Sequence, residues 1–197
     1  KKKNLIVSAK TEILKDDTSI KLFNNLEMKN DTYFNAGVLF IDYQRWTSQN
    51  VQSKLISNFY KYYGTLQFWD QDILNSYFDG SYLELSQKLN KVTNLYYGCD
   101  DDFIETKEEF FNNFLIHYAG KHKPWTLIGI LSFMSVVYQD IYFELYKVRY
   151  HLQIKNRLNN IKILKYAIKD KSLFKTNQLL ILLLRLFIQF LKPKKIF

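Results

Sequence analysis

Cysteine, proline and glycine are scarce in this 197-residue chain, which contains one cysteine, two prolines and six glycines. The single cysteine, Cys99, cannot form an internal disulfide and offers no metal-ligand spacing, so a disulfide scaffold and a cysteine-rich metal site are excluded. This usage is consistent with a reducing compartment. Neither a Gly/Ser-rich linker nor an internal repeat interrupts the sequence, and the length is sufficient for one ordinary domain with its own core.

Long apolar segments are also missing. The first ten residues, KKKNLIVSAK, are basic but are not followed by an apolar core, so we expect no secretory signal there. The most apolar stretch, QLLILLLRLFIQFLK, falls short of the ~20 residues that a membrane-spanning helix needs. Hydrophobic residues make up 47% of the chain and charged residues 24%, which is the composition of a globular protein and not of a disordered one.

Acidic residues are nearly absent from the end of the sequence. Residues 1–146 carry 15 Lys/Arg and 18 Asp/Glu, a balance of −3, whereas residues 147–197 carry 13 Lys/Arg and one acid, Asp170, a balance of +12. The net charge of +9 therefore originates in this tail. Its cations alternate with aliphatic residues and not with glycines or exposed aromatics, a pattern that argues against a nucleic-acid partner.

The tail predicts basic, amphipathic helices. In RLNNIKILKYAIKD, three lysines share one helical face, and Ile161, Leu164 and Ile168 share another. The apolar segment Gln178–Lys192 has a wide apolar face and a narrow polar stripe that includes Arg185. Such helices can lie in the lipid headgroup region, where each Lys or Arg near anionic lipid contributes ~1 kcal/mol. Packing on the rest of the protein is the alternative, but the charge favours contact of residues 147–197 with an anionic membrane surface.

The rest of the chain alternates between strand and helix patterns. Tyr33–Tyr43 becomes continuously apolar at Val38–Ile41, which predicts a strand buried on both faces of a parallel or mixed sheet. Gln44–Gly64 predicts a helix, and Trp69–Phe78 predicts a second one with Asp70 as its N-cap. Two further short strands are expected at SYLELS and FLIHYAG. The alternation indicates an α/β fold.

Three short motifs carry groups that could bind a ligand. The Asn-Ala-Gly motif at residues 35–37 could be a turn, or it could let a ligand approach the backbone while the asparagine amide hydrogen-bonds to it. The Asp-Gln-Asp motif at residues 70–72 could begin a helix, or it could bind sugar hydroxyls. His117 could be an ordinary strand residue. With Gly120 and Lys123, however, it resembles half of a metal–diphosphate site, because imidazole ligates metals and an ammonium neutralises phosphate.

Three blocks, YFNAGVLFIDYQRW, WDQDILN and IHYAGKHKPW, stand in this order. Together they resemble the C-terminal half of the family 8 retaining glycosyltransferases, which include bacterial lipopolysaccharide galactosyl- and glucosyltransferases and the glycogenins. The resemblance covers Tyr33–Trp125, with a weaker similarity at Leu85–Val92, where the family often has an asparagine such as Asn90. It implies a GT-A fold, a UDP-sugar donor and Mn²⁺ (or Mg²⁺).

The resemblance also implies roles for individual residues. His117 would be the imidazole ligand of the metal. The implied donor-binding residues are Asn35, Ala36, Gly37, Asp70, Gln71, Gly120 and Lys123. Of these, Gly120 and Lys123 would contact the phosphates, Asp70 and Gln71 would be catalytic candidates, and Gln71 would lie near the reacting carbon. Asp72 belongs to the motif but is expected to be structural.

The family's Asp-x-Asp metal motif lies upstream of the Asn-Ala-Gly block, and none occurs among the 34 residues that precede Asn35. Asp100-Asp101-Asp102 lies elsewhere and is expected to form a solvated loop. We therefore predict little transferase activity from this polypeptide alone, because carboxylate oxygens are the ligands that Mn²⁺ prefers.

The resemblance implies hexose transfer with retention to a lipopolysaccharide- or lipooligosaccharide-type acceptor, with front-side attack as the preferred mechanism because no covalent carboxylate nucleophile is evident. We expect a catalytic-domain part at residues 1–130 and a membrane-associating tail at residues 131–197. The expected location is the cytoplasm, on the inner face of the plasma membrane. A non-catalytic, membrane-associated remnant is the alternative.

Overall fold

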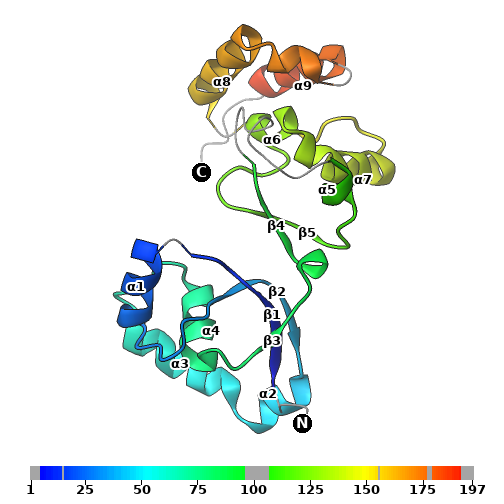
Figure 1. Cartoon of the computed structure of the whole chain (residues 1–197). Coiled ribbons are helices and arrows are strands. Elements are labelled where there is room, and N and C mark those ends of the chain that lie inside the picture. Colours follow the sequence, from blue (N-terminus) through cyan, green and yellow to red (C-terminus); the bar gives the residue numbers. More distant parts are fainter. Residues whose placement is uncertain (1–4, 15, 96–106, 155, 177–178, 192–197) are drawn as a thin grey trace. The chain divides into compact units, whose positions relative to one another are not determined.

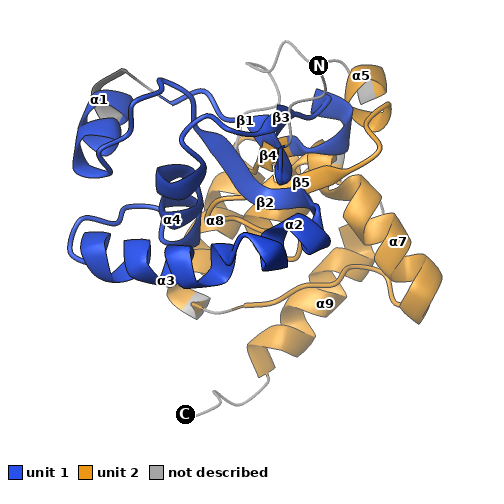
Figure 2. Cartoon of the chain, turned by 90° about the horizontal axis from the view of Figure 1, so that it is seen from below, with its two compact units in different colours: residues 1–91 blue, residues 92–197 orange. Residues whose placement is uncertain are grey.

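The computed structural model describes residues 5–14, 16–95, 107–154, 156–176 and 179–191. The chain divides into two compact units, Lys1–Lys91 and Val92–Phe197 (Figure 2). Each unit has its own hydrophobic core, and each is described by itself below.

A three-stranded mixed sheet organises the first unit. Its strands are β1 (Val7–Thr11), β2 (Phe34–Ile41) and β3 (Leu83–Glu84), in the order β2-β1-β3. β1 pairs antiparallel with β2 and parallel with β3. The predicted strand is therefore present in a mixed sheet, but the expectation that both of its faces are buried is wrong. β2 is an edge strand of this sheet, and the side chains of Phe40 and Ile41 at its end are 53% and 43% exposed.

Helices cover one face of this sheet (Figure 1). The helical segments of the unit are α1 (Asp16–Asn25), α2 (Tyr43–Ser48), α3 (Val51–Tyr62), α4 (Asp70–Phe78) and the 3₁₀ turn η1 (Gln87–Leu89). Val51 of α3 and Phe78 of α4 pack against Val7, Ala9 and Phe34 of the strands. The helix predicted over residues 44–64 is in fact two helices, because Asn50 adopts a left-handed conformation (φ 53°, ψ 41°) between them.

The second unit contains the two-stranded sheet β4-β5 and most of the helices. Its elements are β4 (Lys91–Asn94, which begins at the last residue of the first unit), α5 (Lys107–Phe111), β5 (Ile116–Ala119), α6 (Leu127–Leu131), η2 (Phe133–Ser135), α7 (Val136–Tyr146), α8 (Arg157–Lys169), η3 (Ser172–Lys175) and α9 (Leu179–Leu191). Leu127 and Ile130 of α6 share one core with Ala167, Leu182 and Leu186. The compact units divide at Lys91/Val92, and the boundary expected at 130/131 between a catalytic-domain part and a membrane-associating tail stays a prediction.

The last helix, α9, turns most of its apolar side chains outward. Leu182 and Leu186 are buried, and Arg185 lies between them and donates a hydrogen bond from Nε to the carbonyl oxygen of Arg149 at 3.2 Å. Arg185, a residue of the polar stripe, therefore contacts the backbone of the second unit. The exposed side chains of the opposite face, between 36% and 81% accessible, are Leu180, Ile181, Leu183, Leu184, Phe187, Ile188 and Leu191.

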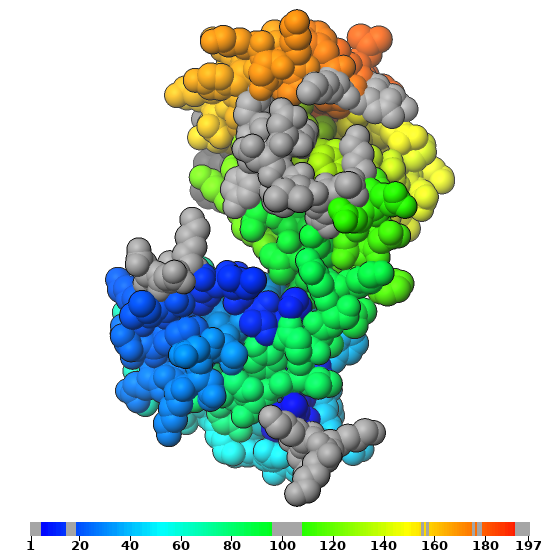
Figure 3. All heavy atoms as spheres, viewed as in Figure 1, coloured from blue at the N-terminus to red at the C-terminus, as the bar shows by residue number. Residues whose placement is uncertain are grey.

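The helix α8 also exposes aliphatic residues. Ile161 and Ile168 are 40% and 48% exposed, whereas Ala167 is fully buried. Figure 3 shows the side chains of α8 and α9, in orange to red, as one region of the surface of the second unit. Among the helices that the structure describes, none is both long enough and apolar enough to cross a membrane.

Candidate functional site

Four polar side chains from separate elements of the first unit form one hydrogen-bonded group, which we call the carboxamide cluster (Glu12, Asn35, Gln71 and Asn90). Glu12 directly follows β1, Asn35 lies in β2, Gln71 lies in the first turn of α4, and Asn90 follows η1. Glu12 Oε2 accepts one hydrogen bond from Asn35 Nδ2 at 3.1 Å and another from Gln71 Nε2 at 2.9 Å. A single carboxylate oxygen therefore joins the two predicted sugar-binding amides.

Backbone groups fix the other end of each amide. Gln71 Oε1 accepts a hydrogen bond from the N–H of Ala36 at 3.0 Å. Asn35 Oδ1 accepts one from the N–H of Gly37 at 3.0 Å and one from Asn90 Nδ2 at 3.2 Å. Because both ends of each amide are held, the two side chains are oriented before any ligand arrives.

The carboxamide cluster keeps some hydrogen-bonding capacity for a ligand. Asn35 and Asn90 are 6% and 1% exposed, so they serve mainly as support, whereas Gln71 is half-buried. An amide has two N–H donors and two acceptor lone pairs. Gln71 uses one donor on Glu12 and one lone pair on Ala36, and its amide also hydrogen-bonds to the hydroxyl of Tyr33, which leaves an acceptor lone pair for a hydroxyl group.

Asn75 holds α4 against β2 and thereby places Gln71. Its Oδ1 accepts from the N–H of Phe34 at 2.8 Å, and its Nδ2 donates to the carbonyl oxygen atoms of Phe34 and of Gln71, each at 2.9 Å. Asn75 is fully buried, so losing any of these bonds would leave a polar group unpaired at a cost of about 1–3 kcal/mol.

Asp72, the last residue of the Asp-Gln-Asp motif, is also fully buried. Its carboxylate accepts hydrogen bonds from the hydroxyl of Tyr33 at 2.5 Å and from the N–H groups of Gln67 and Phe68 at 2.5 and 2.7 Å. Burial, followed by the bond to Asp72, raises the pKa of Tyr33 well above its ordinary value. Asp72 therefore holds the loop that leads into α4 and does not face a ligand.

The residue that precedes α4 is Trp69, so the predicted N-cap at Asp70 is wrong. Asp70 lies in the first turn with its side chain exposed, and it does not hydrogen-bond to the carboxamide cluster. Trp69 has φ 50° and ψ −110°, a conformation that costs a residue with a side chain about 1–3 kcal/mol.

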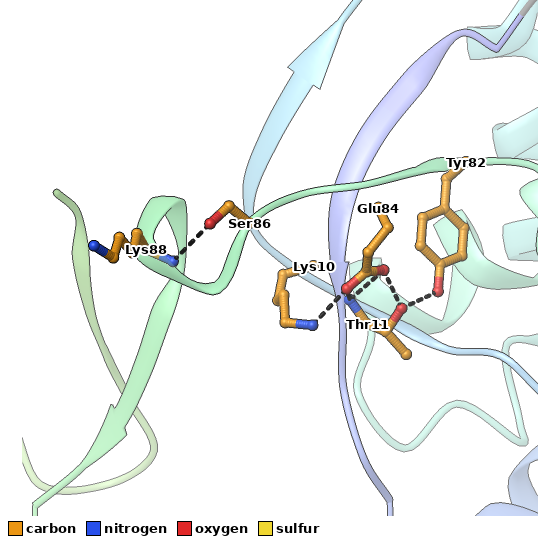
Figure 4. A network of polar contacts seen from close by, with 6 residues as sticks. All are labelled: Lys10, Thr11, Tyr82, Glu84, Ser86 and Lys88. Carbon is orange, nitrogen blue, oxygen red and sulfur yellow. Dashed lines mark hydrogen bonds and ion pairs between the residues drawn. The ribbon is translucent and has the colours of Figure 1, made fainter. Parts of the chain in front are cut away.

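A second polar network, shown in Figure 4, fixes the end of β1 next to Glu12. The Glu84 carboxylate on β3 bonds to Lys10 Nζ at 2.5 Å and to the N–H and hydroxyl of Thr11, and that hydroxyl also meets Tyr82 Oη at 2.6 Å. Burial opposes ionisation of Glu84, but the bonds from Lys10 and Thr11 outweigh it and lower the pKa of Glu84. The network ties β3 to the residue that directly precedes Glu12.

The groups predicted to hold metal and diphosphate lie in the second unit. His117 is half-buried within β5, and Gly120 directly follows that strand with φ +68°. A Cβ atom on Gly120 would lie 2.5 Å from Asn94 Oδ1, so this side chain would have to shift, and the positive φ also favours glycine here regardless of any ligand. Lys123 Nζ donates to the carbonyl oxygen of Tyr118 at 2.6 Å, which positions the ammonium and leaves two of its protons for other acceptors.

The predicted site residues thus form two sets, one in each unit. Asn35, Ala36, Gly37 and Gln71 are brought together in the first unit, whereas His117, Gly120 and Lys123 belong to the second. Within the described parts of the chain, no three His, Cys, Asp or Glu side chains gather as a metal site would require. Residues 100–102 lie outside the described residues, so their expected loop stays a prediction.

Sequence reasoning missed Glu12. The segment SAKTEI contains one carboxylate with no partner at a recognisable spacing. Its position after a strand was the available signal, since polar residues at strand ends often face a site in α/β folds. Its two amide partners are 23 and 59 residues away, which no local pattern reveals.

Comparisons with known proteins identify the family of the chain. The sequence model of Glycosyl transferase family 8 matches residues 8–129. The chain is 28% identical over 114 residues to a lipopolysaccharide 1,2-glucosyltransferase of Escherichia coli K12, with 57% of this chain and 33% of the relative covered. It is 30% identical over 95 residues to a lipopolysaccharide 1,3-galactosyltransferase of Salmonella typhimurium, with 47% and 28% covered. The chain therefore spans about a third of the length of these relatives.

The fold is also similar to that of a solved structure, an active-site mutant of LgtC. The TM-score is 0.53 at 20% identity, and the likeness covers 71% of this chain and 52% of that one. The predicted GT-A-type fold is thereby confirmed, for a chain that covers about half of the compared structure.

The close contact at Gly120 generates a stability prediction. We expect Gly120→Ala to lower the free energy of unfolding by about 1–3 kcal/mol, because the new Cβ meets Asn94 Oδ1 and because φ is positive. Urea unfolding measures this change. In the Asn94→Ala background the same substitution should cost less, since only the backbone strain remains. Equal stability of Gly120→Ala and the parent chain would contradict the described packing.

Proposed function

The chain belongs to glycosyl transferase family 8, and we propose that it contributes to the transfer of a hexose from a UDP-sugar to a lipopolysaccharide- or lipooligosaccharide-type acceptor. The anomeric configuration is retained in this proposal. The observation that carries it is the carboxamide cluster, in which Glu12 orients the amides of Asn35 and Gln71. Orienting donors and acceptors before binding is how a protein recognises the fixed pattern of hydroxyls on a sugar ring.

In the proposed reaction, Gln71 lies beside the anomeric carbon and hydrogen-bonds to the donor hexose, with Asn35 and Glu12 as its support. The backbone at Ala36 and Gly37 lines the pocket, and Asp70 borders it. Glu12 hydrogen-bonds to Gln71, but its Oε2 already accepts two N–H groups, which occupy the lone pairs that a nucleophile would need. This supports attack by the acceptor hydroxyl on the same face as the departing UDP, without a covalent sugar–enzyme intermediate.

We propose that residues of the second unit bind the diphosphate of the UDP-sugar. Lys123 and the backbone at Gly120 contact its oxygen atoms, and His117 is a ligand of Mn²⁺ or Mg²⁺. The described residues do not complete a metal site, since no three ligands gather among them. The steps assigned to this chain therefore rest on its own polar groups: Lys123 neutralises charge on the leaving UDP, and the carboxamide cluster holds the hexose.

Saturation-transfer NMR with UDP-glucose and UDP-galactose tests donor binding directly. We expect the hexose protons to receive saturation from the 197-residue chain. Gln71→Ala and Asn35→Ala should weaken binding about tenfold, the effect of losing roughly 1.4 kcal/mol of hydrogen bonding. Asn24→Ala removes an exposed amide from α1 and serves as the matched control, with binding unchanged.

Two outcomes would contradict the proposal: no saturation of the hexose protons of either nucleotide sugar, or equal saturation in all variants. Binding is the readout because we expect this chain to release little UDP when Mn²⁺ is added. Rapid UDP release would show that the missing Asp-x-Asp carboxylates are not needed.

We also propose that the tail attaches the protein to the cytoplasmic face of the plasma membrane through residues 147–197. Support comes from the exposed apolar face of α9 together with a charge balance of +12 in this segment. Arg185 donates a hydrogen bond to the backbone of Arg149, and Leu184 and Phe187 on the outer side of α9 are exposed. Apolar burial and attraction to anionic lipid act together in such helices.

Vesicle co-sedimentation tests the attachment. We expect binding to vesicles that contain phosphatidylglycerol, weaker binding to pure phosphatidylcholine, and a further decrease at high salt. Leu184→Asp and Phe187→Asp place a charge on side chains that are 58% and 61% exposed, and each should weaken binding more than tenfold, since burying such a side chain contributes about 2 kcal/mol.

Ile56→Asp is the matched control, because it places the same charge on a 49% exposed isoleucine of α3 and should leave vesicle binding unchanged. Strong binding to duplex DNA without binding to lipid would instead support a nucleic-acid partner and would refute the membrane proposal.

A further inference from the structure

The loop before α4 presents an exposed tryptophan in an unusual backbone conformation. The carbonyl oxygen of Phe68 accepts a hydrogen bond from the N–H of Gln71 at 3.1 Å, which closes a four-residue turn. Trp69, at φ 50° and ψ −110°, occupies the first central position of this turn. These angles are close to those of a type II′ turn, in which glycine is strongly preferred at that position. Its side chain is nevertheless 64% exposed to solvent.

The conformation of Trp69 differs from that of two other residues with positive φ. Asn50 (φ 53°, ψ 41°) and Lys147 (φ 54°, ψ 27°) are in the left-handed helical region, which side chains tolerate better. Strained backbone persists only where the surroundings enforce it, and such positions concentrate at ligand sites.

Buried polar groups around the loop enforce the strained backbone conformation of Trp69. The Asp72 carboxylate accepts hydrogen bonds from the N–H groups of Gln67 and Phe68. The hydroxyl of Tyr33 donates a further hydrogen bond to the same carboxylate. The ring of Phe68 packs at 6.4 Å, centroid to centroid, from that of Tyr33. The loop is therefore anchored on both sides of the strained peptide, while the indole of Trp69 remains largely in solvent.

Trp69 lies two residues before Gln71 and next to the exposed Asp70. We propose that the indole of Trp69 stacks against the apolar C–H face of a pyranose ring of the acceptor saccharide. This inference rests on the proposed function, in which the carboxamide cluster binds the donor hexose through polar groups. An aromatic face has negative charge above the ring, so it attracts the positively polarised C–H groups of a sugar, and the indole N–H can also donate to a hydroxyl.

Indole N–H resonances provide a residue-specific test. The chain has three tryptophans, Trp46, Trp69 and Trp125, and Trp→Phe substitutions assign their signals. On titration of the ¹⁵N-labelled chain with lactose, cellobiose or maltose, we expect the Trp69 signal to shift and the signals of the partly buried Trp46 and Trp125 to stay unchanged. Trp69→Leu should weaken disaccharide binding about tenfold, measured by saturation transfer to the sugar.

A glycine substitution separates binding from folding. Trp69→Gly should abolish disaccharide binding without lowering the melting temperature, because glycine adopts φ 50° freely. Tyr63→Gly is the matched control: Tyr63 is 62% exposed but has φ −46°, so its replacement by glycine should lower the melting temperature and leave disaccharide binding intact.

Three results would overturn the proposal: no shift of the Trp69 signal with any disaccharide, equal shifts of all three tryptophan signals, or a shift produced only by a UDP-hexose, which would assign the ring to the donor. Failure here is distinguishable from failure of the proposed function, because the dependence of UDP-hexose binding on Gln71 is measured separately and does not require Trp69.

Discussion

The arrangement of the first unit depends on one carboxylate oxygen. Glu12 Oε2 accepts N–H groups from an asparagine on a strand and from a glutamine on a helix, at 3.1 and 2.9 Å. Without this shared acceptor, no side chain would join the amides of Asn35 and Gln71, whose carbonyl oxygens accept from two different backbone N–H groups. With it, both amides are oriented at the same place, where the end of β1 meets the first turn of α4.

Several buried groups keep that place rigid, although none of them needs to touch a ligand. Asn75 bonds to both backbone groups of Phe34 and so aligns α4 with β2. Glu84 fixes Thr11, the residue before Glu12. Asp72 enforces the turn at which Trp69 is exposed. The Asp-Gln-Asp motif therefore combines an exposed carboxylate, an amide of the carboxamide cluster and a buried anchor within three consecutive residues.

Helices and strands were easier to predict from the sequence than the hydrogen-bond partners of single side chains. The strand at residues 34–41 and the helix at 70–78 were predictable, because their apolar periodicity is local and clear. Glu12 was not, since its partners become neighbours only after the sheet and α4 have formed. The N-cap was misassigned because an aspartate in the first turn has the same local signature as one at the cap. The wide apolar face of α9 was predictable from its periodicity, whereas the bond of Arg185 to the carbonyl oxygen of Arg149, 36 residues away, was not.

A double-mutant cycle on Asn35 and Gln71 tests most directly whether Glu12 unites them. Urea unfolding of Asn35→Ala, Gln71→Ala and the double variant gives the coupling free energy. The shared carboxylate predicts a coupling of about 0.5–1.5 kcal/mol that vanishes in the Glu12→Ala background. Additivity within about 0.3 kcal/mol, or a coupling that persists without Glu12, would contradict a site organised by this residue.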